Sequence, residues 1–140
     1  MVKPLYQKER EVLNFHLSLQ YEYDLAEDIM KYTEINIKQD MPLVADAMRY
    51  LQDSIVKLKR DKCQCVLIIH GYGSTGKGGA ICEKARQWLK AQERNGKVKT
   101  VIFGEDFTLF NFKALELKNK YQELEQLMRV CNNGVTVVEL

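Results

Sequence analysis

Apolar residues follow two different periods along the chain, and these periods predict a succession of strands and helices. Four short runs rich in β-branched residues predict strands, at 34–38, 63–70, 98–103 and 135–140. Between them, apolar residues recur every three or four positions, as in helices with one buried side, over 43–60, 80–94 and 111–130. The order of elements is therefore predicted to be β-α-β-α-β-(α)-β.

This order is typical of an α/β fold, and we expect a compact two-layer α/β sandwich. Right-handed crossover connections would make the first three strands largely parallel. The ends of the first two strands would then lie at one edge of the sheet, beside the starts of the helices that follow them. We therefore expect Asn36, Lys38, His70 and Lys77 to line one cleft.

The first 33 residues fit two patterns. Apolar and polar residues alternate from Leu13 to Leu25, as in a half-buried strand, whereas Val12, Phe15 and Leu19 also fit a helical stripe. We expect residues 1–33 to form an N-terminal extension, with a strand or extended segment over 12–22 and a short helix over 24–32. Residues 34–140 are then expected to form the domain itself.

Composition narrows the class of protein. Hydrophobic residues make up 46% and charged residues 29% of the 140 residues, and the net charge is +2, which is typical of a soluble globular domain. No apolar run approaches membrane-spanning length, so no membrane partner is expected. The four cysteines form no Cys-x-x-Cys pair and have no histidine at zinc-ligand spacing. Reduced thiols, no metal site and a cytoplasmic location are the expectation.

The strand that ends at His70 leads into a loop with five glycines in nine residues, followed by a helix. Glycines let main-chain amides approach a ligand closely, and the amides at a helix start attract anions. Lys77 would add a positive charge, so the loop is predicted to bind phosphate. The alternative is that the glycines form a surface turn and that His70 merely ends a strand.

Three stretches between about residues 34 and 140 resemble the small MutS-related (Smr) domain family. The family's His-Gly-x-Gly motif is intact at 70–73, and its closing strand is matched at 134–140. The family's first motif, Leu-Asp-x-His-Gly, falls at 35–39, where Asn36 and Lys38 replace the aspartate and the histidine. The resemblance implies a fold similar to the C-terminal domain of translation initiation factor three.

The resemblance also implies binding to DNA or RNA, and endonuclease activity with His70 as a catalytic residue. Magnesium or manganese would be needed only for a nuclease. An amide does not bind a metal as a carboxylate does, and lysine is a poor general base. The replacements at Asn36 and Lys38 therefore leave both a nuclease and a non-catalytic module of the ribosome or another RNA assembly open.

A surface that grips nucleic acid would be built from the loop and the end of the first strand. Tyr72, at the tip of the loop, could stack on an unpaired base or simply cap the loop. The predicted nucleic-acid-binding residues are Lys38, Gly71, Tyr72, Gly73, Gly76 and Lys77.

A P-loop-like nucleotide site is a further alternative for the same loop. Gly76 and Lys77 have the required spacing from Gly71, between a strand and a helix. However, Gly78 stands where that motif needs a serine or threonine hydroxyl for the metal. The sequence therefore favours a nucleic-acid binder over an ATPase.

Overall fold

The computed structural model describes residues 12–20, 31–40, 42–72 and 77–140, apart from the side chains of Lys77 and Gly78. Its sheet has four strands in the order β1-β2-β4-β3, with bounds β1 Tyr32–Asn36, β2 Cys65–Ile69, β3 Thr100–Phe103 and β4 Val135–Glu139. β1 is parallel to β2, and β4 is antiparallel to both β2 and β3. The first three strands therefore run in one direction, as the crossover rule predicts.

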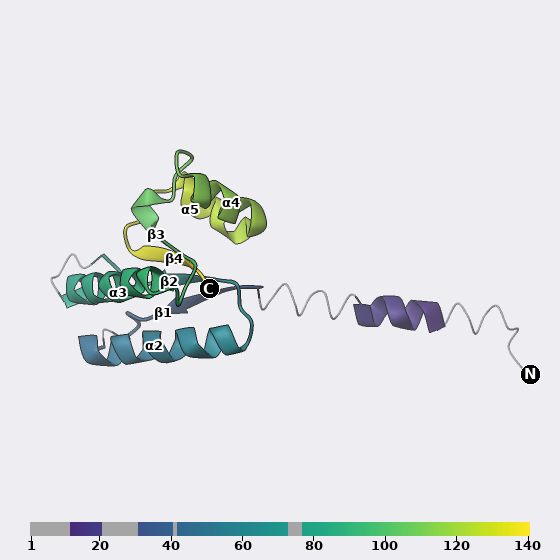
Figure 1. The fold of residues 1–140 in the computed structure, drawn as a ribbon, viewed down its shortest axis with the longest axis horizontal. Helices are drawn as coiled ribbons and strands as arrows, with labels where there is room; N and C mark the ends of the chain where they lie inside the picture. The colour runs from purple at the N-terminus through teal and green to yellow at the C-terminus, as the bar shows by residue number, and fades with distance from the viewer. Residues whose placement is uncertain (1–11, 21–30, 41, 73–76) are drawn as a thin grey trace, which may run out of the picture.

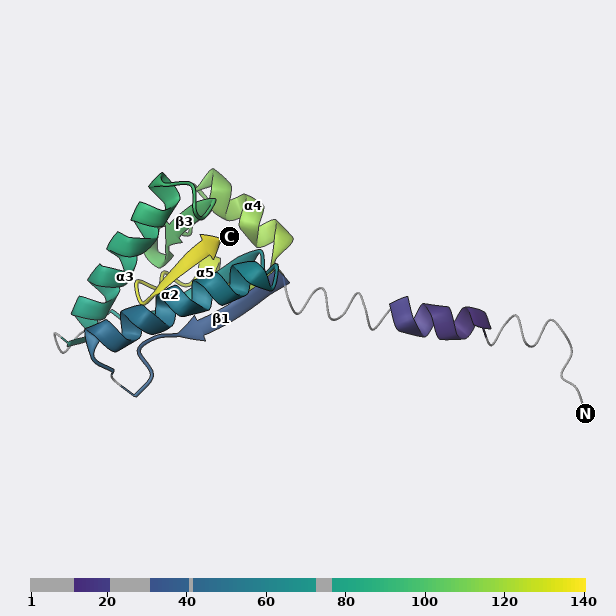
Figure 2. The same cartoon turned by 60° about the horizontal axis from the view of Figure 1, so that its bottom comes forward.

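Two helices, α2 (Val44–Arg60) and α3 (Lys77–Arg94), cover one face of the sheet (Figures 1 and 2). Their apolar stripes pack against β2, where Leu51 of α2 and Leu89 of α3 join Val66 and Ile68 in a core with no exposed surface. The periodicity predicted α2 to within a residue. α3 begins three residues earlier than expected, at Lys77.

The predicted single helix over 111–130 is wrong. The chain forms α4 (Phe112–Lys120), the 3-10 turn η2 (Gln122–Leu124) and α5 (Glu125–Arg129). The break falls at Tyr121, whose backbone is extended. Its ring is buried, and the ring centre lies 6.3 Å from the centre of the Tyr32 ring. Its hydroxyl donates to Gln64 Oε1 at 3.1 Å. Packing of this one ring thus outweighs the helical periodicity.

The α/β class and the order of elements are confirmed, but the sheet lies between two helical layers instead of forming a two-layer sandwich. α4, η2 and α5 pack on the face opposite α2 (Figure 1) and bury Cys65, Ile102 and Val137. The physical reason lies in β4, all of whose residues are buried. Val137 and its neighbour Val138 belong to different cores, so both faces of this strand need a cover.

The N-terminal prediction also needs correction. Residues 12–20 form a helix, so the strand predicted at 12–22 is wrong there. The helical stripe of Val12, Phe15 and Leu19 predicts the observed structure, and the alternation of apolar and polar residues does not. The short helix predicted over 24–32 falls mostly outside the described residues, and Tyr32 belongs to β1. β1 therefore starts and ends two residues earlier than predicted.

A turn against the sheet is possible only because Gly104 has no side chain. This residue starts the 3-10 turn η1 (Gly104–Asp106), in a stretch predicted as a loop. A Cβ atom on Gly104 would lie 1.8 Å from the carbonyl oxygen of Asn132. This close approach places the turn before β4 against the end of β3.

Candidate nucleic-acid interface

The first residues of the glycine loop are fastened to the turn that precedes β4. The main-chain N–H groups of His70 and Gly71 both donate to the carbonyl oxygen of Gly134, at 3.1 and 3.0 Å. Gly71 has a φ of 74°, which favours glycine, and it is buried. Its amide is occupied and is therefore not a donor for a phosphate, contrary to the expectation for this residue.

The His70 side chain is buried inside the domain, with no exposed surface. Its Nδ1 lies 2.8 Å from the carbonyl oxygen of Gly71, and its Nε2 lies 2.8 Å from the hydroxyl of Thr136. Since a carbonyl only accepts, Nδ1 carries the proton and Nε2 accepts from Thr136. Burial lowers the pKa of His70, so the ring stays neutral. Both ring nitrogens are thus engaged in holding the loop.

The end of β1 and the glycine loop come together, but of Asn36, Lys38 and His70, which were expected to line one cleft, only Lys38 lines the cavity there. Asn36 Oδ1 accepts from the Lys38 main-chain N–H at 3.0 Å and turns the chain over the sheet edge. The Lys38 stem crosses Gly71, because a Cβ atom there would lie 2.9 Å from Lys38 Cδ. Lys38 and Tyr72 are both exposed, and with Asn133 they line a cavity of about 310 Å³.

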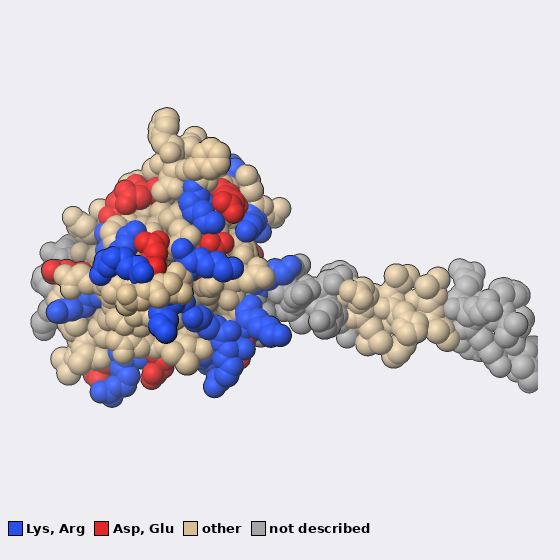
Figure 3. All heavy atoms as spheres, in the orientation of Figure 1, with Lys and Arg blue, Asp and Glu red and all other residues tan. Residues whose placement is uncertain are grey.

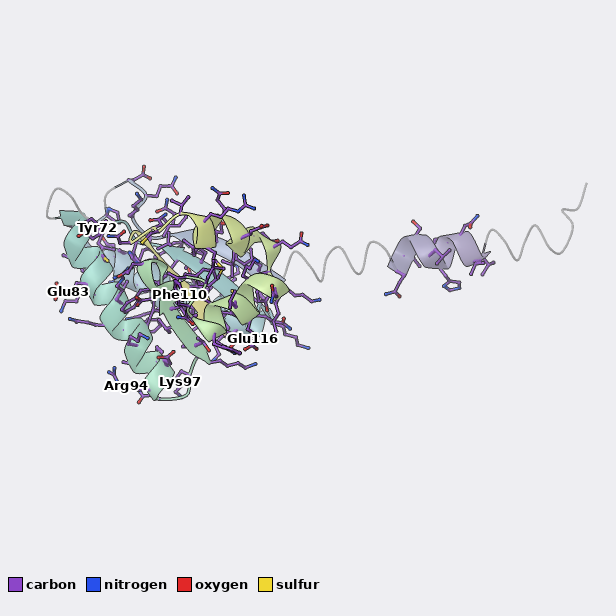
Figure 4. All side chains as sticks on the ribbon, turned by 90° about the horizontal axis from the view of Figure 1, so that it is seen from above. Tyr72, Glu83, Arg94, Lys97, Phe110 and Glu116 are labelled. Carbon is purple, nitrogen blue, oxygen red and sulfur yellow. The ribbon has the colours of Figure 1, made fainter. Side chains whose placement is uncertain are left out.

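A larger groove of about 710 Å³ runs from Tyr72 along one side of α3 (Tyr72 and Arg94 are labelled in Figure 4). Three basic residues of α3 line it at intervals of four, namely Arg86, Lys90 and Arg94. Phe103 lines it too, with the Arg86 guanidinium 4.2 Å and the Lys90 ammonium 5.1 Å from its ring centre. Tyr72 borders both cavities, so they form one continuous surface.

Arg86 ties the groove to the turn that precedes β4. Its guanidinium donates to both carboxylate oxygens of Glu105, at 2.5 and 2.6 Å, and to the carbonyl oxygen of Asn133 at 2.9 Å. The paired arginine lowers the pKa of Glu105. These contacts of Arg86 with Glu105 and Asn133 were not predicted from the sequence. The spacing of Arg86, Lys90 and Arg94 was the available signal for a basic stripe.

The described residues do not fit the divalent metal that a nuclease of this family would use. The resemblance puts Asn36 and Lys38 at the positions of the family's acid and histidine, and Asn36 Oδ1 already accepts a hydrogen bond from the main chain. Glu105 is bound to Arg86 through both oxygens. Within 12–20, 31–40, 42–72 and 77–140, no three His, Cys, Asp or Glu side chains gather where they could hold a metal ion.

Three predicted binding residues remain without a test. Gly73 and Gly76 lie outside the described residues, and Lys77 begins α3 with a side chain that is not described. In the part of the chain that the structure describes, no helix combines the length and the apolar character needed to cross a membrane.

The fold and the surface define a small α/β domain with a basic, aromatic-bordered groove beside a glycine loop at the sheet edge. Residues 42–104, from two residues before α2 to Gly104, match the family model of the Smr domain. This match supports an Smr domain within the chain, and Smr domains generally bind nucleic acid. Comparisons with curated proteins and with solved structures gave no match.

Proposed function

We propose that this domain binds the sugar-phosphate backbone of DNA or RNA through the surface of Lys38, Tyr72 and the basic stripe of α3, here called the loop surface. One observation carries the proposal. Lys38 from the end of β1 and Tyr72 from the glycine loop stand exposed on one cavity, and Tyr72 continues into the α3 groove. Binding to a nucleic-acid backbone depends mainly on positive charges that lie along one surface.

The members of the loop surface would have different tasks. Arg86 is already paired with Glu105, so its charge is largely neutralised and it mainly positions the groove. Lys38 and Arg94 are exposed and would contact phosphates as point charges. Tyr72 is 65% exposed, which leaves its ring open for stacking on an unpaired base.

The glycine loop itself stays part of the proposal. α3 is 18 residues long and starts at Lys77, so the positive end of its dipole faces the loop. Gly73 and Gly76 would let the chain approach a phosphate, and Lys77 would add an ammonium group. Replacing Lys77 with alanine should weaken binding and reduce the salt slope by about one. An unchanged slope would remove Lys77 from the surface.

A second basic cluster on the domain is the rival surface. Lys57, Lys59 and Arg60 gather in the last turn of α2, and Figure 3 shows Lys and Arg side chains clustered around that end of the helix. These charges also complement the negative end of the helix dipole, which explains them without a ligand. Binding assays on variants of both clusters therefore decide between the two surfaces.

We propose that the domain binds without cleaving. The His70 ring is buried with both nitrogens engaged, and Asn36 and Lys38 do not supply the family's acid and base. A plasmid-nicking assay with magnesium or manganese should show no nicking above the metal-free background. Metal-dependent nicking that is lost in Lys38→Ala, with Lys57→Ala as the control, would restore the nuclease.

A cytoplasmic RNA assembly such as the ribosome is the setting that we propose for this activity. Cys63, Cys65, Cys82 and Cys131 are free thiols, as expected in a reducing compartment. Salt-titrated binding to single-stranded and duplex DNA and RNA, with co-sedimentation of the protein with ribosomes, tests the partner. ATP should not compete with nucleic acid, since Gly78 stands where a P-loop needs a serine or threonine hydroxyl for its metal.

A further inference from the structure

The loop before α4 exposes a group of large apolar side chains. Leu109, Phe110 and Phe112 are 64, 100 and 88% exposed, and we call them the aromatic knob. Figure 4 labels Phe110 on the helical layer formed by α4 and α5. Single exposed apolar residues are ordinary, but a cluster with two bare phenylalanines is typical of a contact surface.

The knob has a fixed shape because the loop behind it is well bonded. Phe107 anchors the loop with 1% of its surface exposed. Asn111 donates through Nδ2 to the carbonyl oxygen of Asp106, and its Oδ1 accepts from the Ala114 N–H, both at 3.1 Å. Its own N–H donates to the carbonyl oxygen of Thr108 at 3.0 Å. This hydrogen-bonded turn therefore holds the side chains of Phe110 and Phe112 outward.

The helix at 12–20 also exposes apolar side chains. It contains no charged residue, and Val12, Phe15 and Leu19 lie along one side with 56, 62 and 46% of their surfaces exposed. A helix of nine residues is too short to be stable alone in water. Its stability therefore requires an apolar surface to pack against.

The same chain can bring these two surfaces together. Residues 21–31, eleven in number, separate the helix from β1, and eleven residues span at most about 36–40 Å. The ring of Tyr32, at the start of β1, lies 6.3 Å from that of Tyr121, which directly follows α4. α4 has nine residues and is about 14 Å long. The knob at its other end is therefore within reach.

We propose that the helix at 12–20 docks on the aromatic knob of its own chain through Val12, Phe15 and Leu19. A segment tethered within reach has an effective concentration in the millimolar range, which favours this occupant over a second copy. The proposal does not rest on nucleic-acid binding, because the knob belongs to the layer of α4 and α5 and the loop surface borders α3.

Amide hydrogen exchange of the full chain tests the docking. In Phe110→Asp/Phe112→Asp, amide exchange over 12–20 should become at least about tenfold faster. Burying one large apolar side chain raises the equilibrium constant for docking by about that factor. Leu43→Asp, at an apolar position that is 75% exposed before α2, should leave that exchange unchanged. Protection of β2 and β4 in each variant shows that the domain is folded.

The reciprocal variants lie on the helix. Phe15→Asp should likewise speed exchange over 12–20. Combined with Phe110→Trp, it should also raise the solvent exposure of residue 110, whereas Ser18→Asp, on the polar side, should do neither. Exchange over 12–20 that does not respond to the knob variants would overturn the proposal. So would protection that grows with protein concentration together with a dimer in sedimentation, because a second copy would then be the occupant.

Discussion

The edge of the sheet has a buried half and an exposed half, which differ in what their residues can do. In the buried half, His70, Thr136 and Gly71 bond to one another and to the turn at Gly134. In the exposed half, Lys38 and Tyr72 are exposed to solvent and line the same cavity. The family motif at 70–73 therefore contributes to both halves, and its histidine lies on the buried side.

This difference teaches that a motif residue can serve the site without touching a ligand. The neutral His70 ring fixes the end of β2, and Arg86 fixes the turn at Asn133. Together they hold Lys38 and Tyr72 in place. Changes in the buried half should therefore lower stability first, and changes in the exposed half should lower binding alone.

The largest expected effect is that of Gly104→Ala. The added Cβ atom would meet the Asn132 carbonyl oxygen at 1.8 Å, so the free energy of unfolding should fall by about 3–5 kcal/mol. Gly96→Ala is the matched control, because Gly96 has a φ of 72° but nothing within 4 Å of its Cβ position. It should cost about 1 kcal/mol. Urea unfolding measures both, and equal losses would show that the turn tolerates a side chain.

His70→Ala should follow, with a loss of about 2–4 kcal/mol in the free energy of unfolding. It opens a cavity and leaves the Thr136 hydroxyl without its partner. Thr136→Val, which removes the same hydrogen bond without the cavity, should cost about 1–2 kcal/mol. If either variant kept full stability, the buried half would not hold the loop.

The stability that depends on His70 should also change with pH. Its pKa is lowered in the folded state, so below the ordinary value of about 6.5 the unfolded chain takes up a proton that the folded chain does not. The difference in stability between wild type and His70→Gln should therefore be constant above pH 7 and shift against wild type as the pH falls to 5. A difference independent of pH would indicate an ordinary, exposed histidine.

In the exposed half, Tyr72→Ala should weaken binding to single-stranded nucleic acid by about 1–3 kcal/mol. Binding to a duplex, which offers no unpaired base, should change less. The melting temperature should stay as in wild type, because the side chain is 65% exposed. Fluorescence anisotropy with matched single and double strands measures both effects. Equal losses on the two substrates would contradict stacking.

Periodicity and topology rules predicted the part of the fold that local pattern controls. Apolar spacing predicts α2 and the order of elements. Right-handed crossovers predict that Lys38 and Gly71 lie together at one edge of the sheet. The break at Tyr121 and the second helical layer depend on long-range packing, which no local pattern contains. The burial of His70 also could not be predicted from local pattern. Its ring bonds to Thr136, which lies 66 residues further along the chain.

The slope of log Kd against log salt, compared among wild type, Lys38→Ala and Lys57→Ala, tests the central claim most directly. If the loop surface grips phosphates, Lys38→Ala should reduce the slope by about one, and Lys57→Ala, at the far end of α2, should leave it as in wild type. A slope that falls in Lys57→Ala and not in Lys38→Ala would place binding on the rival cluster and contradict the account.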